Sequence, residues 1–384
     1  MNLLNRPIHK TTDLMEYRSF QYNMIEEFIA ICLKYTMRFG INYDNIEANI
    51  LNDQSYQSET HYSFDKYRIT VNNDTKLNFL ELDFPKLIHG NFFKLKGVYY
   101  VPLIYIFDEP ITFKKDSIKL YSLFKPMTLY FKDNRLTFDS HNIPISRFLR
   151  IYESDNNVIK EICDIVKTQY INESRDESIE KLAVMFNCKK DIDFIKNFIE
   201  LIFFDDWTKE LYEVYYDIEN VNILNLIEII IDRLYNNKKY EFNDLNYKRL
   251  MFIELLLDPL FKAINRFVYR IKNNAPTNQI PIKANAIVHH FYSSRNTGVG
   301  HANTSGLCGN TVYSIVNGYT GLLSSKASFK NPKSQTEIPK SVSSIHESHF
   351  NKICPVTISN KKPGVLASLV PDQKIDLRYG IFKN

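Results

Sequence analysis

Hydrophobic residues recur at intervals of three and four along LMEYRSFQYNMIEEFIAICLKYTMRFG, residues 14–40. This spacing places them on one face of a helix, and Gly40 stands where a C-terminal cap is expected. Residues 61–135 change to short runs rich in β-branched and aromatic side chains, such as YRITV, KLNFLEL and FFKLKGVYYVPLIYI. Runs of this kind predict strands. We therefore expect a strand-rich first part that follows an N-terminal helix.

The middle of the chain, about residues 147–272, returns to a helical pattern. Its clearest segments are NLIEIIIDRLY and YKRLMFIELLLDPLFKAINRFVYRIKNN, and Pro259 is expected to kink the second. The stretch NNAPTNQIP then reads as a linker, and short irregular segments follow. Glycine supports this division, because none occurs between Gly97 and Gly298. The pattern predicts an α+β, multi-domain protein with domains at residues 1–146, 147–275 and 276–384.

Composition narrows the class of protein. A chain of 384 residues suits two or three domains, and a net charge of +4 does not by itself indicate nucleic acid. The five cysteines are widely spaced without a C-x-x-C pair, which disfavours a structural zinc knuckle and suits a reducing compartment. The N-terminus has no signal-peptide core, and no stretch of about twenty apolar residues occurs. We expect a cytoplasmic protein without a membrane span.

Three kinds of site are candidates on residue chemistry alone. Cys354 with His349 as base could form a thiol nucleophile, but a cysteine followed by Pro355 in an apolar stretch is typical of a buried, inert thiol. The stretch GVGHANTSGLCGN lacks the common nucleotide-binding patterns, so it is either a loop that touches phosphates or a plain connection. A metal site is disfavoured, because no H-E-x-x-H occurs and HESH has a poor helical context. The histidines available to a metal are His289, His290, His301, His346 and His349.

Basic residues gather in the last third of the chain among Ser, Thr, Asn and Tyr. Between Arg295 and Lys362 only Glu337 and Glu347 are acidic. Such a region fits an electrostatic track for a phosphate chain, although a solvated basic surface has the same composition. The basic residues are Arg295, Lys326, Lys330, Lys333, Lys340, Lys352, Lys361 and Lys362.

The order of residues near the C-terminus narrows these alternatives. HFNKICPVTISNKKPGVLASL resembles the fork region of the second-largest subunit of multi-subunit RNA polymerases, the bacterial β subunit and its relatives. That region reads H-[YW]-G-x-[VI]-C-P-x-E-T-P-E-G-x-x-x-G-L-x-x-S-L. The positions kept here are His349, Phe350, Lys352, Cys354, Pro355, Gly364, Ser368 and Leu369.

Three earlier stretches are similar to the same family in the same order. GNFFKLKGVYYVP resembles its G-x-F-I-I-N-G-x-E-R-V strand pair. DLNYKRLMFIELLLDPLFKAINRFVYRI resembles its D-x-x-x-x-[KR]-R-[LIV] helix, with the basic pair at Lys248 and Arg249. YSIVNGYTGLLSSKASFK resembles a segment that ends in basic residues facing the RNA–DNA hybrid. Asn317, Tyr319, Thr320 and Lys330 occupy its places, and DLRYGIF resembles the short E-Y-G-F that follows the fork motif.

The chain also departs from the family. TISNKKP replaces the E-T-P-E-G core, so both family glutamates are absent, and Ser343 stands where the family has arginine. The chain stops about where an intact β subunit is half finished. The resemblance therefore implies the N-terminal half of a split β subunit, as in the polymerases of giant tailed bacteriophages. Its location would then be the host bacterial cytoplasm, and a plastid-like or plasmid polymerase is the second hypothesis.

The resemblance implies a fold and partners. The three domains would be a protrusion, a helical lobe, and a fork region that returns to the protrusion, together forming one jaw of the channel. The chain would hold no catalytic residue and no cofactor, since the Mg²⁺ of nucleotidyl transfer belongs to acidic residues of a partner. Expected partners are the C-terminal β fragment, largest-subunit (β′) fragments, template DNA, the RNA–DNA hybrid and a promoter-specificity factor.

The resemblance and the basic track together give the candidate residues. The nucleic-acid contacts are expected at Lys248, Arg249, Arg295, Asn317, Tyr319, Lys330, Lys333, Lys352, Lys361 and Lys362. The structural residues of the fork are expected to be His346, His349, Cys354, Pro355 and Gly364. Two rival hypotheses stay open, a stand-alone basic nucleic-acid-binding protein and a thiol or metal hydrolase.

Overall fold

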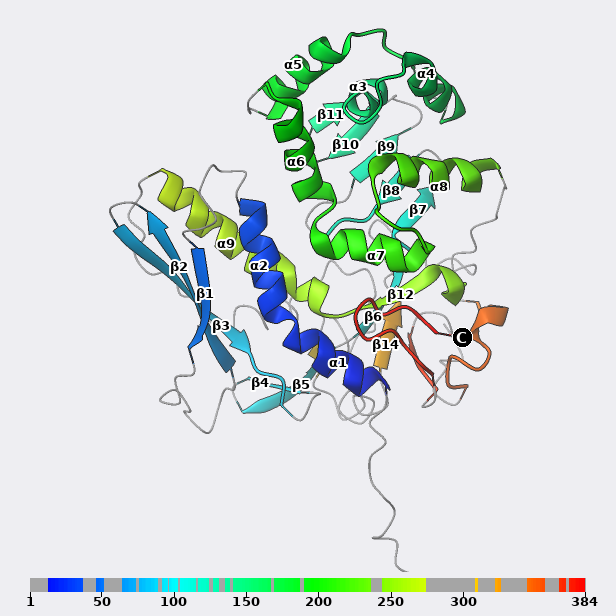
Figure 1. Ribbon diagram of the computed structural model, residues 1–384. Helices are drawn as coiled ribbons and strands as arrows, with labels where there is room; N and C mark the ends of the chain where they lie inside the picture. The colour runs from blue at the N-terminus through cyan, green and yellow to red at the C-terminus, as the bar shows by residue number, and fades with distance from the viewer. Residues whose placement is uncertain are drawn as a thin grey trace, which may run out of the picture. The chain divides into compact units, whose positions relative to one another are not determined.

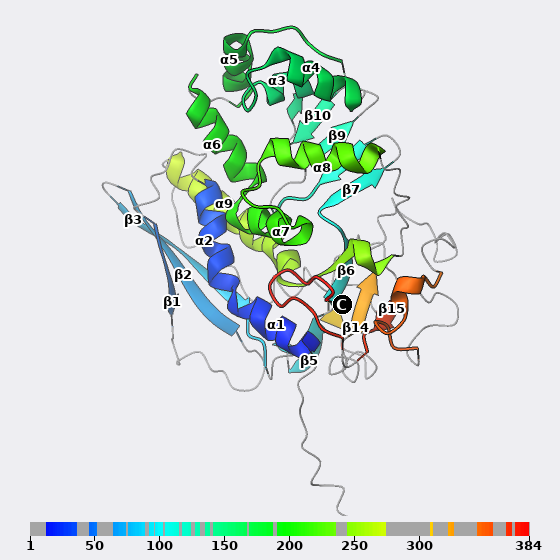
Figure 2. The same cartoon turned by 45° about the vertical axis from the view of Figure 1, so that its right-hand side comes forward.

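The computed structural model divides the chain into two units (Figures 1 and 2). Unit 1 combines Met1–Phe107 with Glu241–Asn384, and unit 2 is the continuous segment Asp108–Tyr240 inserted between them. Helices and mostly antiparallel sheets occur in both, which confirms the α+β class. The structure describes residues 13–36, 46–51, 64–73, 76–88, 92–95, 97–102, 104–114, 117–123, 127–130, 135–138, 141–166, 169–186, 190–235, 244–273, 308–309, 322–325, 344–355, 366–370 and 373–383.

One part of unit 1 is a three-stranded antiparallel sheet with two helices on it. The strands lie in the order β1-β2-β3, and helices α2 and α9 pack against β1, against β3 and against each other (Figure 1). The rings of Tyr35 and Phe261 meet edge to face between the helices, with centroids 4.9 Å apart. The elements are α1 (Asp13–Asn23), α2 (Ile25–Thr36), β1 (Ile46–Leu51), β2 (Phe64–Asn73), β3 (Lys76–Pro85) and α9 (Leu257–Lys272).

The other part of unit 1 is built from strands that are far apart in the sequence. A hairpin of β4 and β5 turns at Gly97, whose φ of 77° suits glycine, and β13 adds to β5. A second sheet has the order β12-β6-β14-β15. The strands are β4 (Phe93–Leu95), β5 (Val98–Pro102), β6 (Ile104–Asp108), β12 (Lys248–Met251), β13 (Cys308–Gly309), β14 (Leu322–Ser325) and β15 (Leu366–Ser368). Three short 3₁₀ turns are η4 (Leu245–Tyr247), η5 (Ile253–Leu256) and η8 (Glu347–His349).

Unit 2 is a five-stranded antiparallel sheet in the order β11-β10-β9-β8-β7 followed by helices. Tyr212 of α7 donates to the Tyr121 carbonyl at 3.0 Å, and Thr208 accepts from the Leu123 N–H at 3.2 Å, so α7 is fixed to the chain after β8. The strands are β7 (Ile111–Lys114), β8 (Ser117–Leu120), β9 (Met127–Tyr130), β10 (Arg135–Phe138) and β11 (His141–Ile143). The helices are α3 (Ile145–Leu149), α4 (Asn156–Ile165), α5 (Arg175–Phe186), α6 (Ile192–Phe203), α7 (Asp206–Tyr216) and α8 (Ile223–Tyr235).

The long helix predicted over residues 247–274 is wrong in its first part. Lys248–Met251 form strand β12, and α9 begins only at Leu257. All four residues of β12 are buried, and a run buried on both faces lacks the alternation that separates strand from helix. Pro259 is the third residue of α9, in the first turn, where no helical N–H bond is lost. It therefore belongs to the start of the helix and does not kink it.

The two units also divide the chain differently from the predicted boundaries. The sequence places a boundary at 146, where strands give way to helices, but the structural boundaries lie at 107 and 240. Strands β7 to β11 pair only with one another among the described strands, and the helices that follow belong to the same unit. Residues 108–146 therefore group with the helical middle. The helix predicted over residues 14–39 is two helices, separated by a turn at Met24.

Candidate nucleic-acid interface

The segments that carry the polymerase resemblance meet in one part of unit 1. Strands β12, β14 and β15 each lie within one of the resembling stretches, and β6 directly follows the hairpin β4–β5. β14 runs parallel to β6 and antiparallel to β15, with Leu323 opposite both Ile104 and Ala367. Segments separated by more than two hundred residues are thereby held in one sheet.

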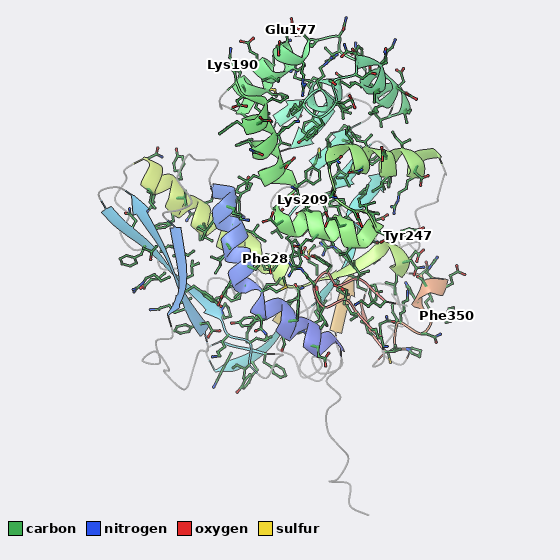
Figure 3. All side chains as sticks on the ribbon, in the orientation of Figure 1. Phe28, Glu177, Lys190, Lys209, Tyr247 and Phe350 are labelled. Carbon is green, nitrogen blue, oxygen red and sulfur yellow. The ribbon has the colours of Figure 1, made fainter. Side chains whose placement is uncertain are left out.

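A second contact joins the fork-like stretch to the segment before β12. The Leu245 N–H donates to Ser348 Oγ at 2.8 Å, and Lys352 Nζ donates to Asn246 Oδ1 at 3.0 Å. Figure 3 labels Tyr247 at the end of η4 and Phe350 just after η8, which mark the two sides of this contact. We call this set of bonds the η4–η8 clamp.

His346 and His349 shape the turn at η8. The Ser348 N–H donates to His346 Nδ1 at 3.1 Å, so His346 caps the turn. His349 is buried, and its Nδ1 accepts from the His346 N–H at 3.5 Å. Each histidine thus uses Nδ1 as an acceptor within the turn, which places the proton of the neutral ring on Nε2. The two rings serve the backbone of the turn in this structure.

Backbone contacts also join the segment that follows η8 to the residues that follow β15. Ile353 pairs with Leu369 in an antiparallel bridge, and the Val370 N–H donates to the Lys352 carbonyl at 3.0 Å. Ile353 and Leu369 are both buried. Between them in the chain, Cys354 is half-buried and Pro355 is exposed. The pairing joins the described residues that precede position 356 to those that follow position 365.

Arg249, expected to contact nucleic acid, has a partner inside the protein. Its two terminal nitrogens donate to the two carboxylate oxygens of Glu254, each at 2.7 Å, and both side chains are at most 2% exposed. This is the bidentate geometry of a strong charge-assisted pair. Lys248 is buried as well. In this conformation Arg249 supports the fold of unit 1 through Glu254.

The turn at residues 376–382 docks on the same strand. The Leu250 N–H donates to the Gly380 carbonyl at 2.8 Å, and Arg249 forms a bridge with Ile381. Gly380 has a φ of 71°, and a Cβ at this position would lie 2.3 Å from the Leu250 carbonyl oxygen. Only glycine fits this approach of two backbones. Burial raises the pKa of the neighbouring Tyr17 hydroxyl, which donates to the same Leu250 carbonyl at 3.1 Å.

Lys352 is the one described residue among the remaining predicted contacts. It is half-buried, with its ammonium on Asn246 and 6.0 Å from the Phe382 ring centroid. The other predicted residues lie outside the described part of the chain. They are Arg295, Asn317, Tyr319, Lys330, Lys333, Lys361, Lys362 and Gly364.

Formal charge is divided unevenly between the units. Unit 2 holds 19 lysines and arginines against 24 aspartates and glutamates, a net −5. Unit 1 holds 29 against 20, a net +9, which together give the +4 of the chain. The basic character therefore belongs to the unit that carries the resembling stretches. Within it, sequence reasoning missed the basic residues of α9, although the helical period of that segment would have aligned them.

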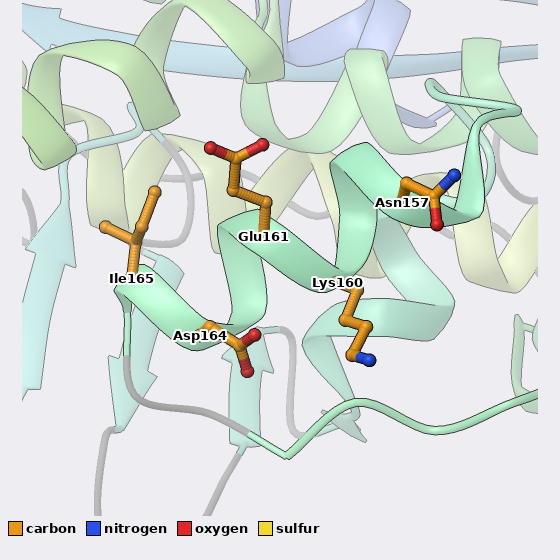
Figure 4. A pocket seen from close by; sticks show the side chains of 5 residues that line it. All are labelled: Asn157, Lys160, Glu161, Asp164 and Ile165. Atoms are coloured by element: carbon orange, nitrogen blue, oxygen red, sulfur yellow. The ribbon is translucent and has the colours of Figure 1, made fainter.

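Three further observations concern the hypotheses of a small-molecule, metal or thiol site. A surface hollow on α4 is lined by one helix only, and Figure 4 shows the carboxylates of Glu161 and Asp164 pointing in different directions. No group of three His, Cys, Asp or Glu side chains in the described part of the chain is arranged to hold a metal ion. Cys32 and Cys163 are buried and Cys354 is half-buried, and none of these three forms a disulfide.

Comparison with known proteins adds no relative. Neither a protein-family model nor a curated protein sequence matches the chain.

Among the described helices, none is both long and apolar enough to cross a bilayer.

Proposed function

We propose that the chain is the N-terminal part of a split β-like subunit of a multi-subunit, DNA-directed RNA polymerase. The observation that carries the proposal is the meeting of the resembling stretches in one place. Strands β12, β14 and β15 come from three of them, and β6 follows the fourth. Chance similarities scattered over residues 90–384 have no reason to fold into one sheet, whereas parts of one ancestral module do.

The division of the chain supports the same proposal. The resemblance implies a protrusion that is interrupted by a lobe and completed after it. Unit 1 is interrupted by unit 2 and completed from Glu241 onward, where β12 and β14 pair with β6 and β15 pairs with β14. In this proposal unit 1 is the protrusion with the fork, and unit 2 is the lobe.

The chain supplies no catalytic group in the proposed enzyme. It forms one jaw of the channel, and its lysines hold phosphates without reading bases. The catalytic aspartates and their Mg²⁺ belong to a largest-subunit partner, where the metal would stabilise the charges of nucleotidyl transfer. The histidines and Cys354 set the shape of the fork.

Co-purification tests the proposal. The full chain, tagged and expressed in its native host context, should bring down a polypeptide resembling the second half of β together with largest-subunit fragments. Two variants are compared with the wild-type chain. The test variant is Ser348→Ala, which removes an acceptor of the η4–η8 clamp, and the control is Ser174→Ala in unit 2. We expect the first to lower recovery of partners and the second to leave recovery unchanged. A well-behaved monomer that binds nucleic acid and recovers none of these partners would favour the stand-alone binding protein.

A further inference from the structure

Helix α9 presents a row of positive charges that the resemblance does not assign. Lys262 and Arg266 are exposed, Arg270 is partly exposed, and Tyr269 between them is 55% exposed. At 100° per residue these four side chains fall within an arc of about 100° on the helix. We call them the α9 stripe.

The opposite side of α9 fixes the orientation of the stripe. Leu260, Ile264, Phe267, Val268 and Ile271 are all buried, and the helix packs on α2 and β3. Rotating α9 would expose these apolar side chains to water, so the stripe is held on the surface. The folded unit therefore presents the cations as a fixed row.

The charge of this row is one-sided. From residue 259 to residue 273 the sequence contains no aspartate or glutamate. Lys262, Arg266 and Arg270 follow one another at intervals of four residues, so their like charges are neighbours on the surface of the helix. An anion lying along the row would be attracted by all three charges.

We propose that the α9 stripe binds the phosphate backbone of a nucleic acid. Successive cations four residues apart stand about 6 Å from each other along the helix axis, so each long side chain can reach a different phosphate. Tyr269 adds an aromatic face in the same row, and such a face can contact sugars or stack on an exposed base. The net +9 of unit 1 gives long-range attraction for the same ligand.

This inference rests on the proposed function for the class of ligand and adds a contact that the resemblance does not name. Binding along a helix by lysine and arginine is independent of sequence, because such side chains contact phosphates and not base edges. The stripe therefore contributes affinity and salt dependence, and it contributes no discrimination between templates.

The test compares two triple variants of the full chain on a labelled 20-base-pair DNA duplex at several salt concentrations. One carries Lys262→Gln, Arg266→Gln and Arg270→Gln. The control carries Lys160→Gln, Arg175→Gln and Lys190→Gln, which remove the same charge from exposed positions of unit 2. Glutamine keeps helix propensity, and far-UV circular dichroism checks that both variants fold.

We expect the stripe variant to flatten the slope of log affinity against log salt by about 2 to 3, since each lost phosphate contact removes about 0.9. The control should keep the wild-type slope. A stripe variant with an unchanged slope overturns the proposal, and so does a control that loses as much as the stripe variant. If polyglutamate of matched charge displaces the DNA as well as unlabelled DNA does, the proposal is also overturned, because the stripe would then bind an acidic protein equally well.

The outcome is separable from that of the proposed function. Partner recovery without any effect of the stripe variant on DNA binding overturns the stripe alone. Loss of DNA binding by the stripe variant, in a chain that recovers no polymerase polypeptide, supports the stripe and overturns the proposed function.

Discussion

In unit 2 the carboxylate of Glu173 is enclosed by Arg147 and Lys181, whereas in unit 1 the cations of α9 stand on an exposed face. Arg147 donates to both oxygens of Glu173 at 2.9 and 2.6 Å, and Lys181 donates at 2.9 Å. Arg233 and the buried Glu109 form a similar pair at 2.5 Å. These cations of unit 2 complete the fold of that unit, whereas the cations of α9 are aligned in one row on the surface of unit 1. The net charge of the whole chain does not distinguish cations in internal ion pairs from cations on the surface.

The two units also differ in how the chain builds them. Unit 2 is continuous, and its sheet pairs neighbouring strands by hairpins. Unit 1 joins two distant pieces, since β6 pairs with β14 in parallel. Long-range pairing of this kind loses the conformational entropy of closing a large loop before the strand contacts can stabilise the fold. The single tryptophan, Trp207, is fully buried in unit 2, so its fluorescence reports the unfolding of that unit.

The largest effect is expected from breaking the buried pair in unit 1. Arg249→Met leaves the Glu254 carboxylate buried without its bidentate partner, which costs about 3 to 5 kcal/mol. The loss should appear in the far-UV circular dichroism transition of unit 1. The Trp207 fluorescence transition of unit 2 should keep its midpoint.

The matched double variant sharpens this test. Arg249→Met combined with Glu254→Leu removes both charges and should recover most of the lost stability, because the desolvation penalty of the carboxylate disappears. If the single variant lowers both transitions equally, the two units unfold together and the comparison between them fails. If it lowers neither, the pair does not support the fold.

The same region shows where sequence reasoning succeeds and where it stops. The helices of the middle are predictable, because α6 and α8 carry apolar residues at helical spacing. Strand β12 is not, because a run of four residues that are all buried gives no alternation, and its partners β6 and Ile381 are distant in sequence. The family resemblance places Arg249 among the nucleic-acid contacts, whereas the structure buries it against Glu254. Glu254, five residues later, was the available signal of an internal pair.

A smaller effect is expected from the ion cluster of unit 2. Hydrogen bonds from Arg147, followed by those from Lys181, lower the pKa of Glu173 from 4.5 to about 2. A carboxyl whose pKa is lower in the folded state stabilises the fold fully above pH 4.5. This contribution is lost as the pH falls toward 2. Glu173→Gln should therefore cost about 2 to 3 kcal/mol at neutral pH and flatten the acid dependence.

Acid titration of the Trp207 fluorescence measures this effect. The wild type should lose stability more steeply than Glu173→Gln between pH 4.5 and pH 2. Glu180→Gln is the control, since Glu180 pairs with Lys190 at the exposed surface, where ion pairs contribute little. Parallel curves for wild type and Glu173→Gln would show that the cluster does not stabilise unit 2.

The smallest effect is expected at a helix start in unit 2, where the burial of the capping side chain decides how much stability its removal costs. The buried Asp205 accepts from the Thr208 N–H at 2.9 Å and from Thr208 Oγ1 at 2.5 Å, and thereby caps α7. The exposed Asp155 caps α4 by accepting from the Asn157 N–H at 2.8 Å. Asp205→Ala should cost about 1 to 2 kcal/mol, near the upper end for a cap, because two donors lose their acceptor away from water. Asp155→Ala should cost about 0.5 kcal/mol, because water replaces the lost acceptor. Both are measured by chemical unfolding followed at Trp207, two residues from Asp205, and equal losses would contradict the role given to burial.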